Sequence, residues 1–107
     1  MSTVRIALYP APDLPGQWIG HCLELDVVSQ GNSASHALEM VAEAIELLAQ
    51  DNVEHGRPAL EPRPAPREVY DLLEGAERSD ITRILRLPPH SSQSPVELAS
   101  YVAARAC

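Results

Sequence analysis

The chain has 107 residues and a formal net charge of −7, with no phenylalanine, one tryptophan and three tyrosines. This length fits one small domain, and a core of aliphatic side chains in so small a domain favours a homodimer or higher homo-oligomer. Two cysteines, Cys22 and Cys107, exclude a disulfide framework, and no apolar run approaches the about 18 residues of a membrane span, so we expect a cytoplasmic protein.

The negative charge is concentrated in the first part of the chain. Residues 1–61 hold nine acidic residues and two arginines, whereas residues 62–107 hold six of each. An acidic surface of this kind repels a phosphate backbone and attracts basic surfaces. The alternative is a solvated face that only keeps the protein in solution.

Three short strands are predicted before the first helix. In residues 3–9, Val4, Ile6 and Leu8 share one face and the residues between them share the other, which is the period of a strand with one buried face. Residues 17–24 give a second strand, in which Gly20 marks a bulge or a close backbone approach, and residues 27–31 give a third, rich in β-branched residues. The short connections between these strands favour an antiparallel meander.

The period then changes to that of an amphipathic helix. Apolar residues recur at helical spacing from Ala34 to about Asp51, with Leu47 among the residues that widen the apolar stripe, and Ser33 is the expected N-cap. The third helical position holds His36, so the carboxylate of a full capping box is missing, and a neutral imidazole is favoured at the positive end of the helix. The residues expected to hold helix and sheet together are Val28, Leu38, Val41, Ile45 and Leu48.

Four prolines in residues 58–66 predict an extended linker. It divides an α+β domain, residues 1–57, from a C-terminal extension, residues 67–107. The predicted fold class is therefore α+β: an antiparallel three-stranded sheet with one long helix packed on it, plus a short, mainly helical C-terminal extension.

Within the extension, a short helix is expected over residues 67–75. Residues 81–87 fit a strand only if Arg83 lies on the buried side, and a helix is the alternative, although we favour the strand. Ser94 opens a complete capping signal, which predicts a final helix to about Ala106.

Carboxylates are the residues that a metal-dependent nuclease needs, and Glu24, Asp26 and Glu39 are the candidates here. Because Glu39 lies opposite the apolar stripe, we favour a solvated acidic face and assign no catalytic residue, no metal site and no cofactor. His21 and Cys22 are neighbours on a strand and point to opposite faces. We expect Cys22 in the core and His21 at the surface or at an interface.

A DNA-binding interpretation rests on residues 82–89. A basic strand that ends in Leu-Pro and is followed by helices is how ribbon-helix-helix proteins begin, and these proteins insert a paired β-ribbon into the major groove. In this interpretation, the side chain of Arg83 would face outward and contact base edges, with Arg86 beside it. The extension carries no net charge and is predicted to hold one clear helix after this strand, so it is at most a degenerate form of that motif.

The most specific stretch of the chain is WIGHCLELDVVSQGNSASHALEMVAEAIELLAQ, residues 18–50. It resembles the N-terminal domain of the HicB family of antitoxins. The matching positions are Trp18, Glu24-Leu25, Val28-Ser29-Gln30-Gly31, Ser33, Ala37-Leu38 and Glu43-Ala44-Ile45-Glu46-Leu47. The joint match of SQG, a hydroxyl cap and EAIEL covers about a third of the chain.

The resemblance implies a partial RNase H-like β-β-β-α-β fold that lacks the nuclease carboxylates. It also implies a non-enzymatic protein that masks a small basic toxin, a HicA-like mRNA interferase, and many family members add a C-terminal DNA-binding domain. The side chains that would form the partner surface are Glu24, Asp26, Glu39, Glu43 and Glu46. Two alternatives stay open: an autorepressor that binds DNA through Arg83 and Arg86, and an RNase H-like nuclease.

Overall fold

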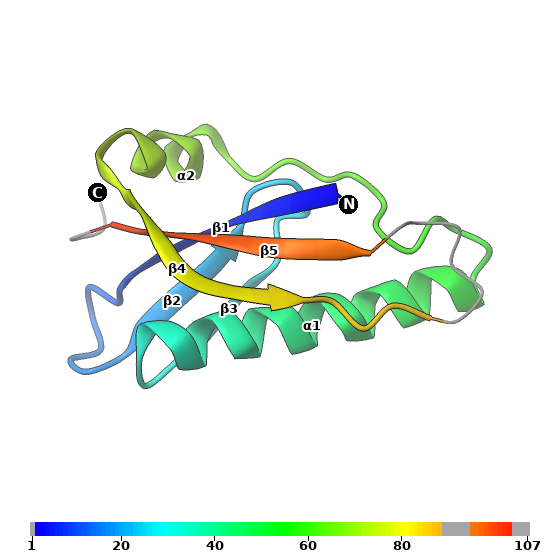
Figure 1. Ribbon diagram of the computed structural model, residues 1–107, viewed down its shortest axis with the longest axis horizontal. Coiled ribbons are helices and arrows are strands. Elements are labelled where there is room, and N and C mark those ends of the chain that lie inside the picture. The colour runs from blue at the N-terminus through cyan, green and yellow to red at the C-terminus, as the bar shows by residue number, and fades with distance from the viewer. Residues whose placement is uncertain (1, 89–94, 104–107) are drawn as a thin grey trace.

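The computed structural model describes residues 2–88 and 95–103, which form a mixed sheet with helices on both faces (Figure 1). In chain order the elements are β1 (Ser2–Pro10), β2 (Trp18–Cys22), β3 (Val28–Gly31), α1 (Ala34–Glu54), α2 (Arg67–Asp71), the 3₁₀ turn η1 (Leu72–Gly75), β4 (Glu77–Ile84) and β5 (Val96–Val102). The three early strands and the long helix therefore lie where the sequence predicts them. The coarse α+β class is confirmed as well.

The sheet differs from the prediction in size and in direction. It has five strands in the order β3-β2-β1-β5-β4, and β5 runs parallel to β1 whereas every other neighbouring pair is antiparallel. The expected three-stranded antiparallel sheet is therefore wrong, because it omitted two strands from the C-terminal part of the chain. Residues of the predicted extension complete the sheet that residues 1–57 begin.

The predicted final helix is also wrong, because residues 96–102 form β5. This strand pairs with β1 from Ser2↔Val96 to Leu8↔Val102, and its Val96 and Leu98 join the core beneath α1. The rest of that predicted helix, residues 94 and 103–106, lies largely outside the described residues. The strand favoured over residues 81–87 is confirmed in part by β4, and no helix follows β4 in the described part of the chain, so the ribbon-helix-helix order is absent there.

The long helix α1 covers one face of the sheet with a stripe of small and aliphatic residues. The fully or nearly fully buried positions of this stripe are Ala37, Leu38, Val41, Ala42, Ile45, Ala49 and Asn52. Two residues predicted for this core are exposed instead: Val28 points to the other face of the sheet, and Leu48 lies on the flank of the helix. Leu38, Val41 and Ile45 are in the core as predicted.

Close approach of α1 to the sheet depends on Gly20 and Gly31. A Cβ atom on Gly31 would lie 2.6 Å from the backbone nitrogen of Ala37, and one on Gly20 would lie 3.1 Å from the carbonyl oxygen of the same residue. The close backbone approach predicted at Gly20 is therefore what the structure has. Any larger residue at these two positions pushes the start of α1 away from β2 and β3.

The start of α1 is capped as the sequence indicates, with one addition. The backbone N–H of His36 donates to Ser33 Oγ at 3.1 Å, which confirms the N-cap. The backbone N–H of Asn32 donates to Nδ1 of His36 at 2.9 Å, so His36 does part of what the missing carboxylate of a capping box would do.

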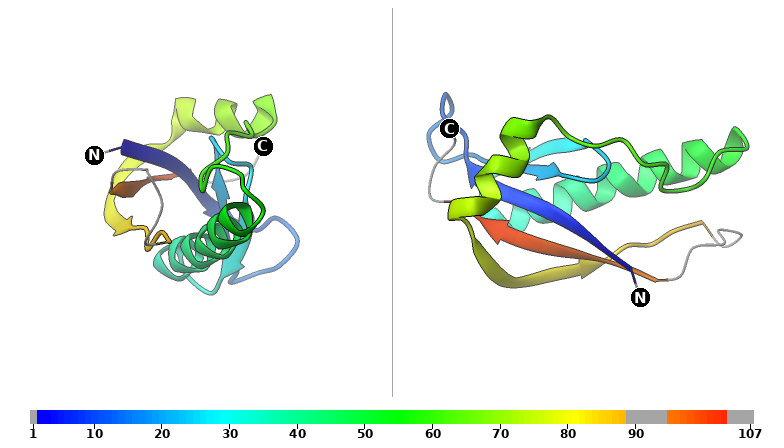
Figure 2. Two further views of the ribbon diagram at one scale, coloured as in Figure 1. Left: turned by 90° about the vertical axis from the view of Figure 1, so that its right-hand side faces the viewer. Right: turned by 90° about the horizontal axis from the view of Figure 1, so that it is seen from above.

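The other face of the sheet is covered by α2 and the segment that leads into it (Figure 2). Its small core consists of Ala7, Leu23, Ala65 and Val69, with Tyr9, Tyr70 and Leu73 packed against it. The proline-rich residues 58–66 hold no helix or strand, as predicted, but they are bonded to the body of the protein. Arg63 N–H donates to Glu24 O at 3.0 Å and Ala65 N–H donates to Leu23 O at 2.8 Å.

Within the described residues, we find no helix that combines the length and the apolar character needed to cross a membrane.

Candidate functional site

The five acidic residues predicted as a partner surface fall in two places. Glu24 and Asp26 lie in the turn between β2 and β3, whereas Glu39, Glu43 and Glu46 lie on α1. The turn and the helix belong to different layers of the fold. Most of these carboxylates are also bonded to cations of the same chain, so the prediction of one continuous acidic surface has to be examined residue by residue.

Glu24 is bonded to Arg5 by two contacts. Its Oε1 accepts the backbone N–H of Arg5 at 2.8 Å, and its Oε2 accepts Nε–H of the same residue at 2.6 Å. This hydrogen bond is the main reason that the pKa of Arg5 is raised above its ordinary value. The guanidinium of Arg5 also lies 5.6 Å from the ring centroid of Tyr70, so Glu24 helps to hold β1, the β2–β3 turn and α2 together.

Asp26 is bonded to His21. Nε2 of His21 donates to Oδ1 of Asp26 at 2.7 Å, and His21 is buried within the chain, so of the two predicted places, surface or interface, the surface is wrong. Asp26 has a φ of 51°, a left-handed conformation that aspartate tolerates better than most residues. Its backbone N–H donates to Cys22 O at 3.0 Å, which closes the turn. The contact with His21 therefore fixes a tight turn of strained backbone.

Arg83 connects the edge of the sheet to α1. Its guanidinium donates to Glu39 Oε1 at 2.8 Å and to Glu46, and its side chain is only 14% exposed. Arg83 pairs with Leu98 of β5, which points to the α1 face, so Arg83 does lie on the buried side of β4. This meets the condition that the sequence set for a strand here.

Glu46 also accepts a hydrogen bond from the backbone of the segment that follows β4. The N–H of Arg86 donates to Glu46 Oε2 at 2.6 Å. Partial burial, the largest single effect on Glu46, raises its pKa, but the hydrogen bonds from Arg83 and from Arg86 N–H together outweigh it, so the pKa of Glu46 lies below its ordinary value. Hydrogen bonds to Glu46 and then to Glu39 raise the pKa of Arg83, which is fully charged.

Glu43 is different from the other four acidic residues. Its carboxylate has no hydrogen bond or ion pair within residues 2–88 and 95–103. It borders a hollow of about 540 Å³ between α1 and the segment after β4. The residues around this hollow are Glu43, Glu46, Leu47 and Gln50 from α1, and Arg86, Leu87 and Pro88 from the facing segment.

Leu47 is the residue of this hollow that the sequence misplaced. It was assigned to the apolar stripe of the helix, yet it is 70% exposed, more than any other large apolar side chain in the described part of the chain. Leu47 follows Glu43 by four residues, so the two share one side of the helix. That spacing was the signal available in the sequence.

The nuclease alternative requires carboxylates that converge on a metal ion. Glu24, Asp26 and Glu39 are instead bonded to Arg5, His21 and Arg83 respectively. Across the described ranges, no group of three or more histidine, cysteine, aspartate or glutamate side chains could hold a metal ion. Cys22 is fully buried, as predicted, and burial raises the pKa of its thiol to about 12.

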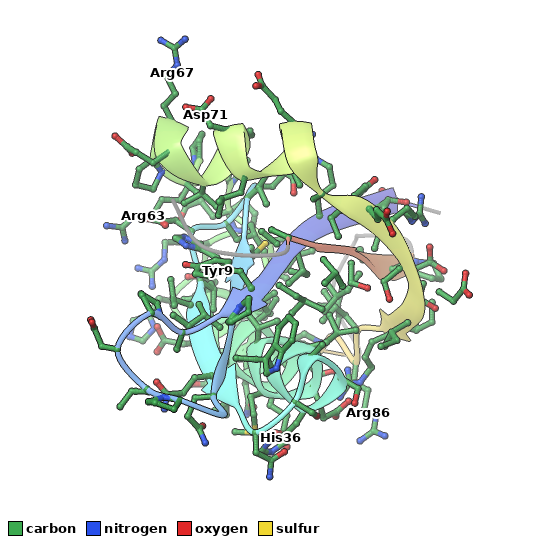
Figure 3. All side chains as sticks on the ribbon, turned by 90° about the vertical axis from the view of Figure 1, so that its left-hand side faces the viewer. Tyr9, His36, Arg63, Arg67, Asp71 and Arg86 are labelled. Atoms are coloured by element: carbon green, nitrogen blue, oxygen red, sulfur yellow. The ribbon has the colours of Figure 1, made fainter. Side chains whose placement is uncertain are left out.

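The DNA-binding alternative requires the side chains of Arg83 and Arg86 to be exposed and not engaged in ion pairs within the chain. Arg83 is bonded to two glutamates and does not point outward as a reader of bases would. The side chain of Arg86 is exposed and points away from the body of the protein on the α1 side (Figure 3). One free arginine beside three glutamates of α1 does not make a basic surface.

Comparison of the chain with protein-family models, with curated proteins and with solved structures gives no match.

Proposed function

We propose that this chain is a non-enzymatic, HicB-like antitoxin or antitoxin-derived protein that binds and masks a small basic mRNA-interferase toxin of the HicA-like type. Its fold is proposed to be the partial RNase H-like unit that the resemblance implies. The protein supplies no catalytic group in this role. Its contribution is a folded acidic surface that competes with RNA for the basic surface of the toxin.

The observation that carries this proposal is the junction between β3 and α1. Two residues of the SQG-N-S motif have a structural role there, because Gly31 lets the helix approach the sheet and Ser33 caps it. The EAIEL segment that follows places Ile45 in the core and leaves Glu43 exposed. The matched positions therefore include both scaffold residues and a free acidic residue.

The order of elements gives a second line of support. The resemblance implies three strands, a helix and a further strand, and this chain has β1, β2, β3 and α1 followed by β4 and β5. A net charge of −7, with −7 carried by residues 1–61, adds long-range attraction for a basic partner.

The proposal is tested with the product of an adjacent reading frame that encodes a small basic protein. Co-expression should give a complex that elutes as one peak in size-exclusion chromatography, and light scattering on the free chain reports whether it forms the expected homo-oligomer. The purified partner should cleave RNA, and an equimolar amount of this chain should stop the cleavage. A partner that elutes separately, or RNA cleavage that continues in the presence of excess chain, contradicts the proposal.

A further inference from the structure

The hollow between α1 and residues 86–88 joins an apolar floor to a charged rim. Leu47 of α1 faces Leu87 and Pro88 across it, and Glu43 and Gln50 flank Leu47 by one turn on either side. Leu87 packs against the main core, so this wall is anchored to the body of the protein. A single exposed leucine is ordinary on a protein surface, but a leucine 70% exposed inside a hollow with two further apolar residues is a place where a side chain can be buried.

The two walls of the hollow carry charges of opposite sign. The guanidinium of Arg83 forms ion pairs with both Glu39 and Glu46, which leaves Glu43 as the carboxylate of this cluster with no ion pair among the described residues. The helix itself contains five acidic residues and no lysine or arginine. On the facing wall stands the exposed side chain of Arg86, so a cation that enters the hollow is attracted to the α1 wall and repelled from the other wall.

We propose that this hollow is the docking site for a short amphipathic segment of a basic protein, which places an apolar side chain between Leu47 and Leu87 and a lysine or arginine against Glu43. The inference rests on the proposed function and names the surface through which it would act. The partner is basic because a chain with a net charge of −7 attracts a cationic protein, and because Glu43 on the α1 wall has no ion pair among the described residues. The apolar contact supplies affinity, and the ion pair with Glu43 sets orientation and the rate of association.

Calorimetry with two synthetic peptides tests the site on the full-length chain. One peptide contains leucine and lysine at helical spacing and the other contains leucine and glutamate at the same positions, each of about 15 residues, enough for four helical turns. The leucine-lysine peptide should bind and the leucine-glutamate peptide should not. Leu47→Ser should weaken binding about tenfold or more, because the burial of one leucine is lost, and Glu43→Gln about threefold to tenfold.

Matched control variants separate the hollow from the general negative charge of the protein. Leu14→Ser removes an exposed leucine and Asp13→Asn removes an exposed carboxylate, both from the β1–β2 loop. Both should leave binding unchanged. Equal losses in the control variants and in Leu47→Ser or Glu43→Gln overturn the proposal, as does a wild-type chain that binds neither peptide.

Two further results separate this inference from the proposed function. If the basic toxin binds the wild-type chain and the Leu47→Ser chain equally well, the antitoxin proposal stands and the docking site is wrong. If no toxin binds but the leucine-lysine peptide shows the expected loss with Leu47→Ser, the docking site stands and the antitoxin proposal fails. Self-association that Leu47→Ser abolishes, measured by sedimentation, identifies the occupant as a second copy and overturns the choice of a basic partner.

Discussion

The guanidinium of Arg83, on β4, is bonded to the carboxylate of Glu46, on α1, and this contact ties the edge of the sheet to the helix that covers it. The sequence placed these two residues in competing hypotheses. In one, Arg83 contacts DNA bases; in the other, Glu46 is part of an acidic surface that binds a partner protein. In the folded chain they neutralise each other. The acidic face of α1 is therefore smaller than the sequence implies, and Glu43 is what remains of it beside the hollow.

Arg83 should contribute to stability, and Arg86 should not. Arg83→Ala leaves Glu46 and Glu39 without their charged donor in a part-buried site, so we expect a loss of about 2 kcal/mol in the free energy of unfolding. Arg86→Ala removes an exposed side chain but keeps the backbone N–H that bonds Glu46, so its effect should stay within about 0.5 kcal/mol. Urea unfolding followed by circular dichroism measures both, and equal losses would show that the bond between Arg83 and Glu46 does not stabilise the fold.

Lowering the pH should remove the contribution of the Glu46 carboxylate to the free energy of unfolding. Its pKa in the folded chain lies below the ordinary 4.5, so the stabilising charge is fully present above pH 4.5 and is lost as the pH falls through the folded value. The difference in unfolding free energy between wild type and Glu46→Gln should thus be largest near neutral pH and shrink in acid. In an Arg83→Ala background this pH dependence should be weaker, because the donor that lowers the pKa is gone. Denaturant titrations at a series of pH values decide between these outcomes.

Gly31 should not tolerate a side chain, whereas Gly75 should. A Cβ at Gly31 would lie 2.6 Å from the backbone of Ala37 and 2.8 Å from the His36 ring, so Gly31→Ala should destabilise the protein by about 1–3 kcal/mol. Nothing lies within 4 Å of a Cβ at Gly75, and its φ is not positive. Gly75→Ala should be neutral or stabilise by about 0.5 kcal/mol. Thermal melts of both variants test this, and a Gly31→Ala chain as stable as wild type would be incompatible with the close helix–sheet approach.

The thiol of Cys22 should be inert in the folded protein. It is fully buried and burial raises its pKa to about 12, so at pH 8 neither access nor thiolate is available. In a Cys107→Ser chain, Ellman's reagent should give no fast reaction in buffer and one equivalent of thiol in denaturant. Rapid labelling of Cys22 under native conditions would mean that the sheet opens readily at β2.

The elements near the N-terminus could be predicted because their signals are local. Val4, Ile6 and Leu8 recur at a period of two, Ser33 caps the helix, and the stripe through Val41 and Ile45 has helical spacing. Each of these patterns lies within a few residues of the element that it defines. The structure places all of them as the sequence indicates.

The prediction failed for β5 because its partner is distant in sequence. Val96, Leu98 and Ser100 also alternate, but the capping signal around Ser94 and the apolar spacing at Leu98 and Val102 fit a helix equally well. Pairing with β1, more than ninety residues earlier, decides in favour of the strand, and no local pattern contains that information. The sheet was therefore predicted with two strands too few.

The candidate site was predicted only in part for a similar reason. The sequence identified Glu24, Asp26, Glu39 and Glu46 as acidic, but not the partners Arg5, His21 and Arg83 to which they are bonded. Those partners come from other strands, up to 44 residues away along the chain. Of the five, only Glu43 has a carboxylate with no hydrogen bond or ion pair among residues 2–88 and 95–103.

The parallel pairing of β1 with β5 also sets a condition on how this protein is made. Among the described elements, β1 emerges from the ribosome first and β5 emerges last. In the finished sheet, however, β5 lies between β1 and β4. Until residues 96–102 have left the exit tunnel, one edge of β1 has no neighbour and its backbone groups are open to other chains. Synthesis of residues 96–102 is therefore the step that closes this edge of β1, and a chain interrupted before that step keeps the edge open to pairing with other chains.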